Sequence, residues 1–560
     1  MLRCDLAVNG RANDRRGPSL FEAVETPEAT TVGDPRGFER AIWAFVGLGI
    51  FLRVTRYLLN FPLWHDEAFV AVNFIDRGYL AMMGRLEYSQ VCPLLFLWIE
   101  LTVVRLLGFS EWSLRLFPTV CAVLSVWLFW HVATRLLVGW PRLLAVAVFA
   151  VSYYPIRHGA EVKPYASDLL VALGLLALAI EWRQAPGRSL WLWVLAGCAP
   201  LALLLSHPSV FVAGGIGLAI LPAAWRSGRW RVRGAYLAFG MALTATFLGL
   251  LIGYTGTPES EELRQHYLMN YWVDSFPPME SLWALGSWLF RMHAGTMLAY
   301  PIGGENGASL LTLVGVATGA IWLGRRGSWT VLAMLLLPFG MGLVAAFLGR
   351  YPYGGAARIM QYLAPSICLL AGLGASALLS RIGSEPKRHR VSIGIVAVLA
   401  LLGVGQFAKA LVAPYHIESS ARAREFARWF WVEQSREAEV ACLKTDFGRR
   451  VEPHQWKAGI SAEYLCNRQI YAPRKVTPKW EPTALEPLAD RPLRCVLYHV
   501  HWFDPPESKP EFLDWLQAMT SRYDLQSRES YTVNAGQGLE SWKEETYIVF
   551  EFAARSGSMD

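Results

Sequence analysis

The sequence carries too little charge for a soluble protein of its size. Only 17% of its 560 residues are charged, whereas 54% are hydrophobic and the mean hydropathy is +0.29. Soluble domains carry about 25% charged residues. The shortage of charge excludes an ordinary soluble enzyme. The apolar residues gather in runs of about 20, the length of a membrane-spanning helix, and these runs recur between residues 41 and 412.

Other features are also missing. No apolar core of a signal peptide precedes residue 41, so we expect the first apolar segment to target the chain. No nucleic-acid-binding motif is present, and the net charge of +7 comes from Lys and Arg clusters between apolar runs, which indicate topology rather than nucleic-acid binding. Of the eight cysteines, three follow residue 412, and an oxidising compartment would permit one disulfide among Cys442, Cys466 and Cys495.

Eleven apolar segments predict transmembrane helices. They are 41–59, 113–134, 143–156, 166–182, 190–205, 210–225, 234–254, 308–323, 330–348, 359–379 and 391–412. A further segment, 91–107, is apolar but short and is interrupted by Glu100 and Arg105. We interpret it as a juxtamembrane helix that lies in the interface.

Basic residues decide the orientation. With segment 91–107 in the interface, five successive short loops rich in basic residues share the side of the N-terminus, which is the cytoplasm by the positive-inside rule. These loops hold Arg135/Arg142, Arg183/Arg188, Arg226/Arg229/Arg231/Arg233, Arg325/Arg326 and Arg381/Lys387/Arg388/Arg390. The polar tail 1–40 is then cytoplasmic. The outer loops are 60–112, 157–165 and 255–307, with smaller outward segments at 206–209 and 350–358.

Residues 413–560 have the composition of a soluble domain and fall on the outer side. REFARWFWVEQSREAE and PEFLDWLQAMTSRY predict amphipathic helices, while EVACLKTDF, RCVLYHVHWF and ETYIVFEFA predict strands. The expected fold is therefore an α-helical polytopic membrane protein of about eleven transmembrane helices and a juxtamembrane helix, over residues 41–412, followed by an extracytoplasmic α/β domain.

Acidic and basic side chains gather in the outward segments. WHDE places Asp66 and Glu67 at the end of the first span, and RHGAEVKPYASD adds Glu161 between two spans. A single loop carboxylate is usually just solvated. Two acidic clusters beside membrane helices, with cations close by, favour a catalytic or binding site. Its other candidate residues are His65, Lys163, Tyr165, His207, His266 and Arg358.

These motifs resemble the GT-C membrane glycosyltransferases, the class that includes protein mannosyltransferases and the bacterial aminoarabinose transferase. The resemblance rests on WHDE, QVCP at 90–93, GFSEWSLRLFP at 108–118, AEVKPYASD at 160–168 and SHP at 206–208, and it covers roughly residues 41–380. It implies a protein of the bacterial inner membrane that takes a sugar from a polyprenyl-phosphate carrier. The sugar would pass, with inversion, to a lipid, glycan or protein acceptor at the outer face.

Carried over residue by residue, the resemblance implies roles for the candidates. Asp66 would be the general base or the carboxylate that positions the acceptor, with Glu67 as its neighbour or substitute and Glu161 as the second acid. Such chemistry needs a carboxylate to take the hydroxyl proton and cations to hold the leaving phosphate. The cation candidates are Lys163 and Arg358, with Arg115 weaker, and His65, Tyr165, His207 and His266 would contact substrate.

Several alternatives stay open. Cys92 stands where the aminoarabinose branch has Lys, and Asp168 competes with Glu161 as the second acid. Asp66 and Glu161 could share a divalent cation, Mg²⁺ or Mn²⁺, since some GT-C enzymes bind one and others work without it. The competing functions are a multi-helix transporter, which should show paired repeats and charges near the midplane, and another lipid-linked glycan step such as polymerisation or ligation.

Overall fold

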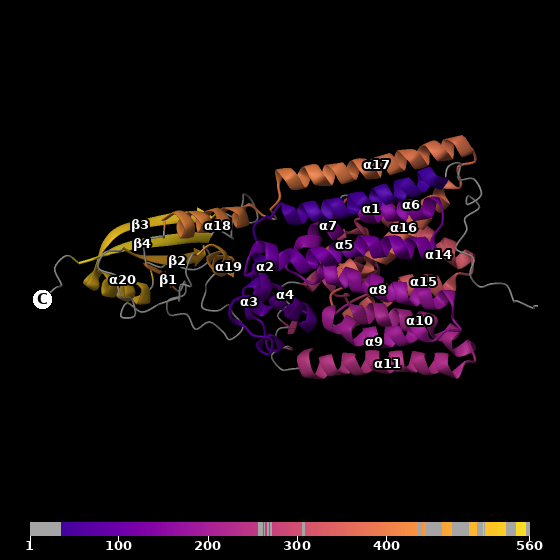
Figure 1. Cartoon of the computed structure of the whole chain (residues 1–560), viewed down its shortest axis with the longest axis horizontal. Coiled ribbons are helices and arrows are strands. Elements are labelled where there is room, and N and C mark those ends of the chain that lie inside the picture. The colour runs from indigo at the N-terminus through magenta and orange to yellow at the C-terminus, as the bar shows by residue number, and fades with distance from the viewer. Residues whose placement is uncertain are drawn as a thin grey trace, which may run out of the picture.

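A bundle of membrane helices carries a small α/β domain at one end, the end that the predicted topology places outside (Figure 1). The computed structural model describes residues 35–255, 261, 264–265, 268, 272–304, 308–415, 417–434, 439–443, 462–472, 492–500, 508, 510–533 and 545–555. His266 lies outside these residues. The two parts follow one another along the long axis of the molecule, and the N-terminal end of the first helix, α1, lies at the end of the bundle far from the α/β domain.

All eleven segments predicted to span the membrane are helical. The helices that cover them are α1 (Pro35–Leu58), α5 (Glu111–Leu136), α6 (Trp140–Ala150), α8 (Tyr165–Gln184), α9 (Leu190–Leu205), α10 (Ser209–Arg226), α11 (Trp230–Leu250), α14 (Ala308–Arg325), α15 (Trp329–Phe347), α16 (Ala364–Leu379) and α17 (Glu385–Val412). Shorter helices accompany them: α7 (Tyr153–Arg157), η3 (His158–Ala160), η4 (Leu251–Thr255), η5 (Val273–Ser275), α13 (Leu282–Ala294), η6 (Thr296–Leu298) and η7 (Ala357–Leu363), with η1 (Ala81–Met83) and η2 (Glu87–Ser89) in the segment 60–112.

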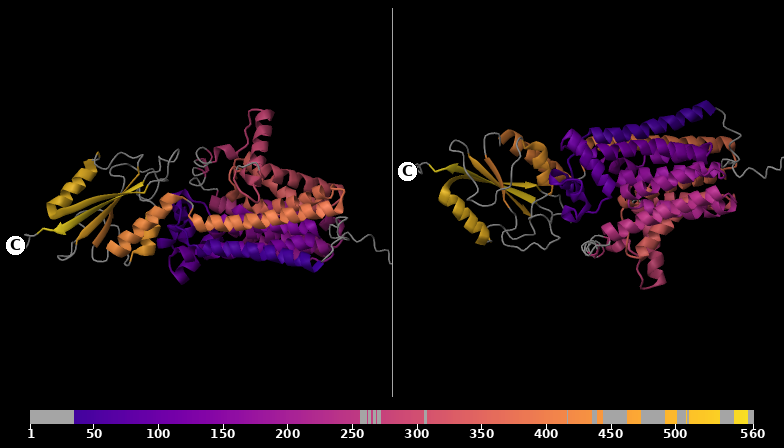
Figure 2. Two further views of the ribbon diagram at one scale, coloured as in Figure 1. Left: turned by 90° about the horizontal axis from the view of Figure 1, so that it is seen from above. Right: turned by 60° about the horizontal axis from the view of Figure 1, so that its bottom comes forward.

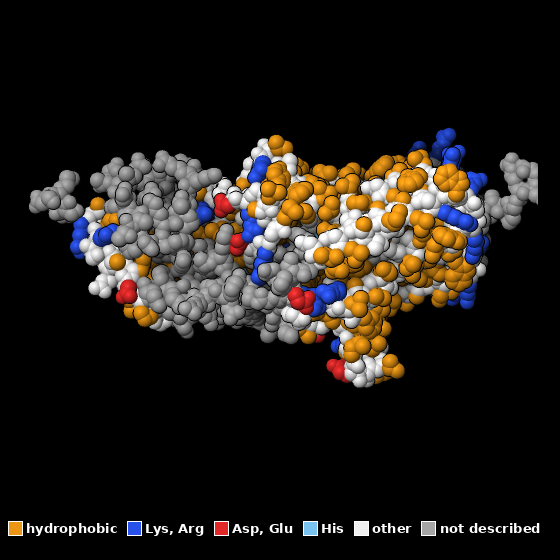
Figure 3. All heavy atoms as spheres, turned by 90° about the horizontal axis from the view of Figure 1, so that it is seen from below, with side chains coloured by type: hydrophobic (Ala, Val, Ile, Leu, Met, Phe, Trp, Pro, Cys, Tyr) orange, Lys and Arg blue, Asp and Glu red, His pale blue; other side chains and the backbone are white. Residues whose placement is uncertain are grey.

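The predicted count of eleven spans is not confirmed. Among the described residues, eight helices are long and apolar enough to cross a bilayer, and counting α6 with the bent stretch Tyr153–Ala160 as one span gives up to nine. The bend between them is 47°, and α9 and α14 are apolar but shorter. Lys and Arg side chains gather at the end of the bundle away from the α/β domain, as the predicted topology requires (Figure 3).

Segment 91–107 forms a single helix, α4 (Leu94–Leu107). Its 14 residues reach about 21 Å at 1.5 Å per residue, short of the roughly 30 Å of a hydrocarbon core. It lies beside α2 (His65–Ala71) and α3 (Asn73–Asp76) at the outer end of the bundle (Figure 1). The length of α4 therefore agrees with a juxtamembrane helix.

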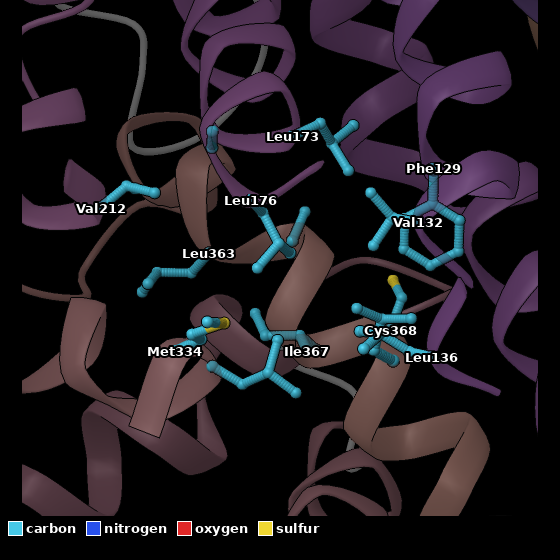
Figure 4. Close-up of a cluster of buried hydrophobic side chains, with 14 of the residues drawn as sticks. Phe129, Val132, Leu136, Leu173, Leu176, Val212, Met334, Leu363, Ile367 and Cys368 are labelled. Carbon is cyan, nitrogen blue, oxygen red and sulfur yellow. The ribbon is translucent and has the colours of Figure 1, made fainter. Parts of the chain in front are cut away.

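Close backbone contacts around α16 hold the bundle together. A Cβ atom on Gly374 would come within 1.9 Å of the Gly315 carbonyl oxygen in α14, and one on Gly372 within 2.5 Å of the Ala145 nitrogen in α6. Small residues let membrane helices approach this closely. Figure 4 shows side chains of α5, α8, α10, α15 and α16 converging in the same buried region. The helices that carry the outer loops are thus fixed relative to one another.

The C-terminal domain is a four-stranded sheet with helices on both faces (Figure 2). The strand order is β1-β2-β4-β3, with β1 parallel to β2 and the other pairs antiparallel. Its elements are β1 (Glu439–Leu443), β2 (Leu493–Val500), β3 (Tyr523–Val533), β4 (Glu545–Ala554), α18 (Glu418–Arg428), η8 (Trp429–Gln434), α19 (Ala462–Tyr471) and α20 (Pro510–Arg522).

Alternation of apolar residues explains the two covered faces. Val496, Tyr547 and Val549 pack with α18, η8 and α19, whereas their neighbours Leu497 and Phe550 pack with α20. The predicted α/β domain is therefore present. The sequence did not predict α19 or β3.

The packing of α16 can be tested at Gly374. Gly374→Ala should lower the free energy of unfolding by about 1–3 kcal/mol, because the new methyl group must displace backbone. Thermal unfolding in detergent measures the effect. Gly240→Ala in α11 is the matched control, since nothing lies within 4 Å of the added Cβ. Equal melting of the two variants would mean that α14 and α16 do not depend on this contact.

Candidate active site at the outer face

WHDE begins a helix rather than a loop. Trp64, the N-cap of α2, has an extended backbone, and its N–H lies 3.4 Å from the Glu67 carboxylate three residues later. This is the reciprocal half of a capping box, and acidic residues in a first turn also stabilise the partial positive charge of the helix start. The helix start therefore fixes the direction of three consecutive side chains, His65, Asp66 and Glu67.

Glu67 forms a buried ion pair with Arg115 of α5. The Arg115 Nε donates to Oε1 at 2.8 Å and Nη2 donates to Oε2 at 2.6 Å, and the two side chains are 0% and 1% exposed. Burial raises the pKa of the Glu67 carboxyl, and the adjacent guanidinium opposes that rise. Arg115 also donates to the Phe61 and Pro62 carbonyl oxygens. Both side chains therefore serve to hold α2 and the residues before it against α5.

Asp66 is the exposed member of the acidic pair. Its Oδ2 lies 3.0 Å from Nη1 of Arg358, and the side chains are 25% and 28% exposed. The Arg358 guanidinium also lies 5.6 Å from the Trp64 ring and 5.8 Å from the Trp272 ring, within range of a cation–π interaction. Two residues that the sequence assigned to base and phosphate binding are thus brought together in contact with solvent.

The second outer segment packs against the first. The Val162 N–H donates to Glu67 Oε1 at 3.0 Å, and Lys163 Nζ donates to Gln90 Oε1 at 2.7 Å. The Tyr165 hydroxyl lies within electrostatic range of Asp66, Arg358 and Glu161. Tyr165 therefore lies near Asp66, and Lys163 joins the second segment to the first through Gln90. Gln90 had no predicted role, although it begins the motif QVCP.

Glu161 is buried and pairs with a histidine of its own segment. Its Oε2 lies 2.7 Å from Nδ1 of His158, and the Glu161 side chain is 0% exposed. The spacing of three residues between His158 and Glu161 was the available signal for this pair. The rival acid, Asp168, is also buried, in the first turn of α8. Among the three predicted catalytic acids, Asp66 is the one that solvent reaches.

The histidines predicted for the site do not lie together in the structure. His65 Nδ1 lies 3.1 Å from Glu463 of α19 in the C-terminal domain. His207 lies in the turn between α9 and α10, and burial lowers its pKa to about 4, so the ring is neutral at pH 7. Within the described contacts, none joins His207 to Asp66. His266 cannot be placed because it is outside the described residues.

The described residues offer no ready cation site. No group of three or more His, Cys, Asp or Glu side chains among them could hold a metal ion. Asp66 already faces the Arg358 guanidinium and Glu161 already faces the His158 ring. A divalent cation shared by the two acids therefore does not fit the present arrangement.

A family model matches the segment that carries much of this site. Residues 91–250 match the model described as dolichyl-phosphate-mannose-protein mannosyltransferase. The resemblance to the GT-C membrane glycosyltransferases is confirmed over this stretch. It includes Glu161, Lys163 and His207, while Asp66 and Arg358 lie outside it. None of the curated proteins matches the sequence.

Solved structures give weaker likenesses. ArnT from Cupriavidus metallidurans bound to undecaprenyl phosphate is 11% identical with a TM-score of 0.49, and the match covers 92% of this chain and 98% of that protein. The oligosaccharyltransferase AglB from Archaeoglobus fulgidus, in complex with an inhibitory peptide and a dolichol-phosphate, is 10% identical with a TM-score of 0.41, covering 93% and 75%. At these values neither likeness bears on the activity of the chain.

The role of the Glu67–Arg115 pair can be tested by stability. Glu67→Gln leaves the Arg115 cation buried without its anion, which costs about 3–5 kcal/mol. We expect a lower unfolding temperature in detergent and faster proteolysis within residues 60–112. Glu87→Gln is the matched control, because Glu87 pairs with Arg77 in the same loop with both side chains partly exposed, where a pair contributes about 0–1 kcal/mol. Similar losses in both variants would argue against a special role for Glu67.

Proposed function

We propose that the protein is a membrane glycosyltransferase of GT-C type. It moves a sugar from a polyprenyl-phosphate carrier to a hydroxyl of a lipid, glycan or protein acceptor at the outer face of the bacterial cytoplasmic membrane. The observation that carries the proposal is the Asp66–Arg358 pair, an exposed carboxylate and guanidinium 3.0 Å apart in an outer segment. The match of residues 91–250 to a mannosyltransferase family that uses a dolichyl-phosphate sugar supports the donor class.

Asp66 serves as the general base in this proposal. Its carboxylate takes the proton of the acceptor hydroxyl while the hydroxyl oxygen attacks the anomeric carbon. The bond between that carbon and the phosphate oxygen breaks on the opposite side, so the configuration inverts. The products are the glycosylated acceptor and the polyprenyl phosphate, and the proton remains on Asp66 until water removes it.

Arg358 and Lys163 serve the leaving group. The polyprenyl phosphate departs with a full negative charge, which a cation stabilises most where water is partly excluded. Arg358 offers a bidentate fork for phosphate oxygens, and Lys163 offers a point charge beside Gln90. Arg358 pairs with Asp66 in the absence of substrate. It turns to the phosphate when the donor binds, because the base and the leaving group stand on opposite sides of the anomeric carbon. A transporter would instead need charged groups near the membrane midplane, whereas these lie in outer segments.

Asp66→Asn should abolish transfer. The amide cannot accept the hydroxyl proton, so we expect the rate to fall by a factor of about 10² to 10⁴ while expression and membrane insertion persist. The assay uses membranes with a panel of labelled polyprenyl-phosphate sugars and total lipid and envelope glycans as acceptors. Asp76→Asn, an exposed acid of α3, is the matched control. Full activity of Asp66→Asn would remove Asp66 from the chemistry, and a wild type that uses no donor of the panel would contradict the proposed function.

The proposed orientation can be tested by cysteine labelling in spheroplasts. In a background with Cys4, Cys442, Cys466 and Cys495 replaced by Ser, Ser508→Cys should react with a membrane-impermeant maleimide, because we place the α/β domain outside. Arg381→Cys should react only after permeabilisation, because we place it in the cytoplasm. The reverse pattern would mean that α4 crosses the membrane after all, since one added span inverts every later loop.

A further inference from the structure

The C-terminal domain reaches into the candidate active site through α19. Glu463 Oε1 lies 3.1 Å from Nδ1 of His65, and three residues further along each helix the Cys466 Sγ lies 3.7 Å from the Ala68 carbonyl oxygen. The two contacts are three residues apart on both helices, so α19 and α2 lie side by side over this turn. Cys466 is thus a free thiol at the interface, not a disulfide partner.

Glu463 is itself held in place before it meets His65. Its side chain is 3% exposed, and the Ser420 hydroxyl of α18 donates to the same oxygen, Oε1, at 2.8 Å. A carboxylate removed from water needs such donors. The soluble domain therefore fixes the position of the Glu463 carboxylate. Because His65 contacts this carboxylate, Glu463 also restrains the first turn of α2.

Two further contacts fasten the domain around the same loop. Arg424 of α18 donates to the Asn60 carbonyl oxygen at 2.5 Å, at the start of the outer loop. The Tyr471 hydroxyl at the end of α19 donates to Glu111 Oε1 at 2.8 Å, in the first turn of α5. The domain therefore contacts the loop near both ends as well as at α2, and it cannot shift relative to His65 without breaking these contacts.

Three successive residues of α2 thus have partners on three different elements. His65 meets Glu463 of α19, Asp66 meets Arg358 of η7, and Glu67 meets Arg115 of α5. The side chains of His65 and Glu67, on either side of Asp66, are both held by these contacts. The orientation of the helix turn, and with it the direction of the Asp66 carboxylate, is therefore fixed.

We propose that Glu463 is a positioning residue of the glycosyltransferase, so that the C-terminal domain completes the active site from outside the membrane. This inference rests on the proposed function. Glu463 touches neither donor nor acceptor in it. It holds His65, and through the first turn of α2 it keeps Asp66 aimed at the acceptor hydroxyl.

The test compares Glu463→Ala with Glu463→Gln in the full-length protein. Alanine removes the contact to His65, so we expect kcat to fall on the order of tenfold to a hundredfold, the effect of a misplaced catalytic group, with the donor KM nearly unchanged. Glutamine keeps an oxygen that accepts from His65 and should restore kcat to within about threefold of the wild type, because the role is positional. Glu551→Ala is the matched control, since it removes a pair with Arg494 inside the sheet.

A second readout does not depend on transfer. Hydrogen exchange over residues 60–71 should be faster in Glu463→Ala than in the wild type and unchanged in Glu551→Ala. If Glu463→Ala fails to fold, His65→Ala replaces it and should show the same loss of kcat and the same faster exchange.

The outcomes separate the two hypotheses. An active wild type with an equally active Glu463→Ala, or a Glu463→Gln as impaired as the alanine variant, overturns the positioning role and leaves the proposed function standing. Unchanged exchange over residues 60–71 in Glu463→Ala also overturns that role. A wild type that transfers no sugar from any donor overturns the proposed function, and the positioning role with it.

Discussion

The candidate site depends on one buried ion pair, Glu67 with Arg115. Taking both charges out of water is costly, and such pairs are better understood as fixing one arrangement than as adding net stability. Here the pair joins α2 to α5, while the Val162 N–H and the Phe61 carbonyl oxygen bring in the second outer segment and the end of the first span. The elements that carry the candidate site thus meet at this one ion pair.

The adjacent acids Asp66 and Glu67 differ in burial. Glu67 is 0% exposed and has both oxygens bonded to Arg115, whereas Asp66 is 25% exposed and faces Arg358. A carboxylate that anchors a loop must stay in place, and one that takes a proton must meet its substrate. Neighbouring positions on a helix start point about 100° apart, so the same tetrapeptide can supply an anchor and a base.

The sequence predicted the individual helices and strands better than the contacts between them. Apolar runs located the helices, including the short α4, and alternation located most strands of the C-terminal domain, because these signals are local. The sequence did not fix the number of spans, since α9 and α14 are short and the chain bends by 47° between the end of α6 at Ala150 and Tyr153. The resemblance proposed Asp66 as the base, with Glu67 as its neighbour or substitute, and the difference in burial between the two became visible only in the structure. The contact of His65 with Glu463 joins residues 398 apart, beyond the reach of any periodic pattern.

The shortness of α2 explains why the site draws on distant parts of the chain. Its seven residues fall well below the roughly 12–15 that an isolated helix needs in water, so it stays helical through its neighbours. Arg115 supports it from the membrane helices and Glu463 from the soluble domain, on residues flanking Asp66. A helix held on both flanks presents its middle side chain in one direction, and that direction here is toward Arg358.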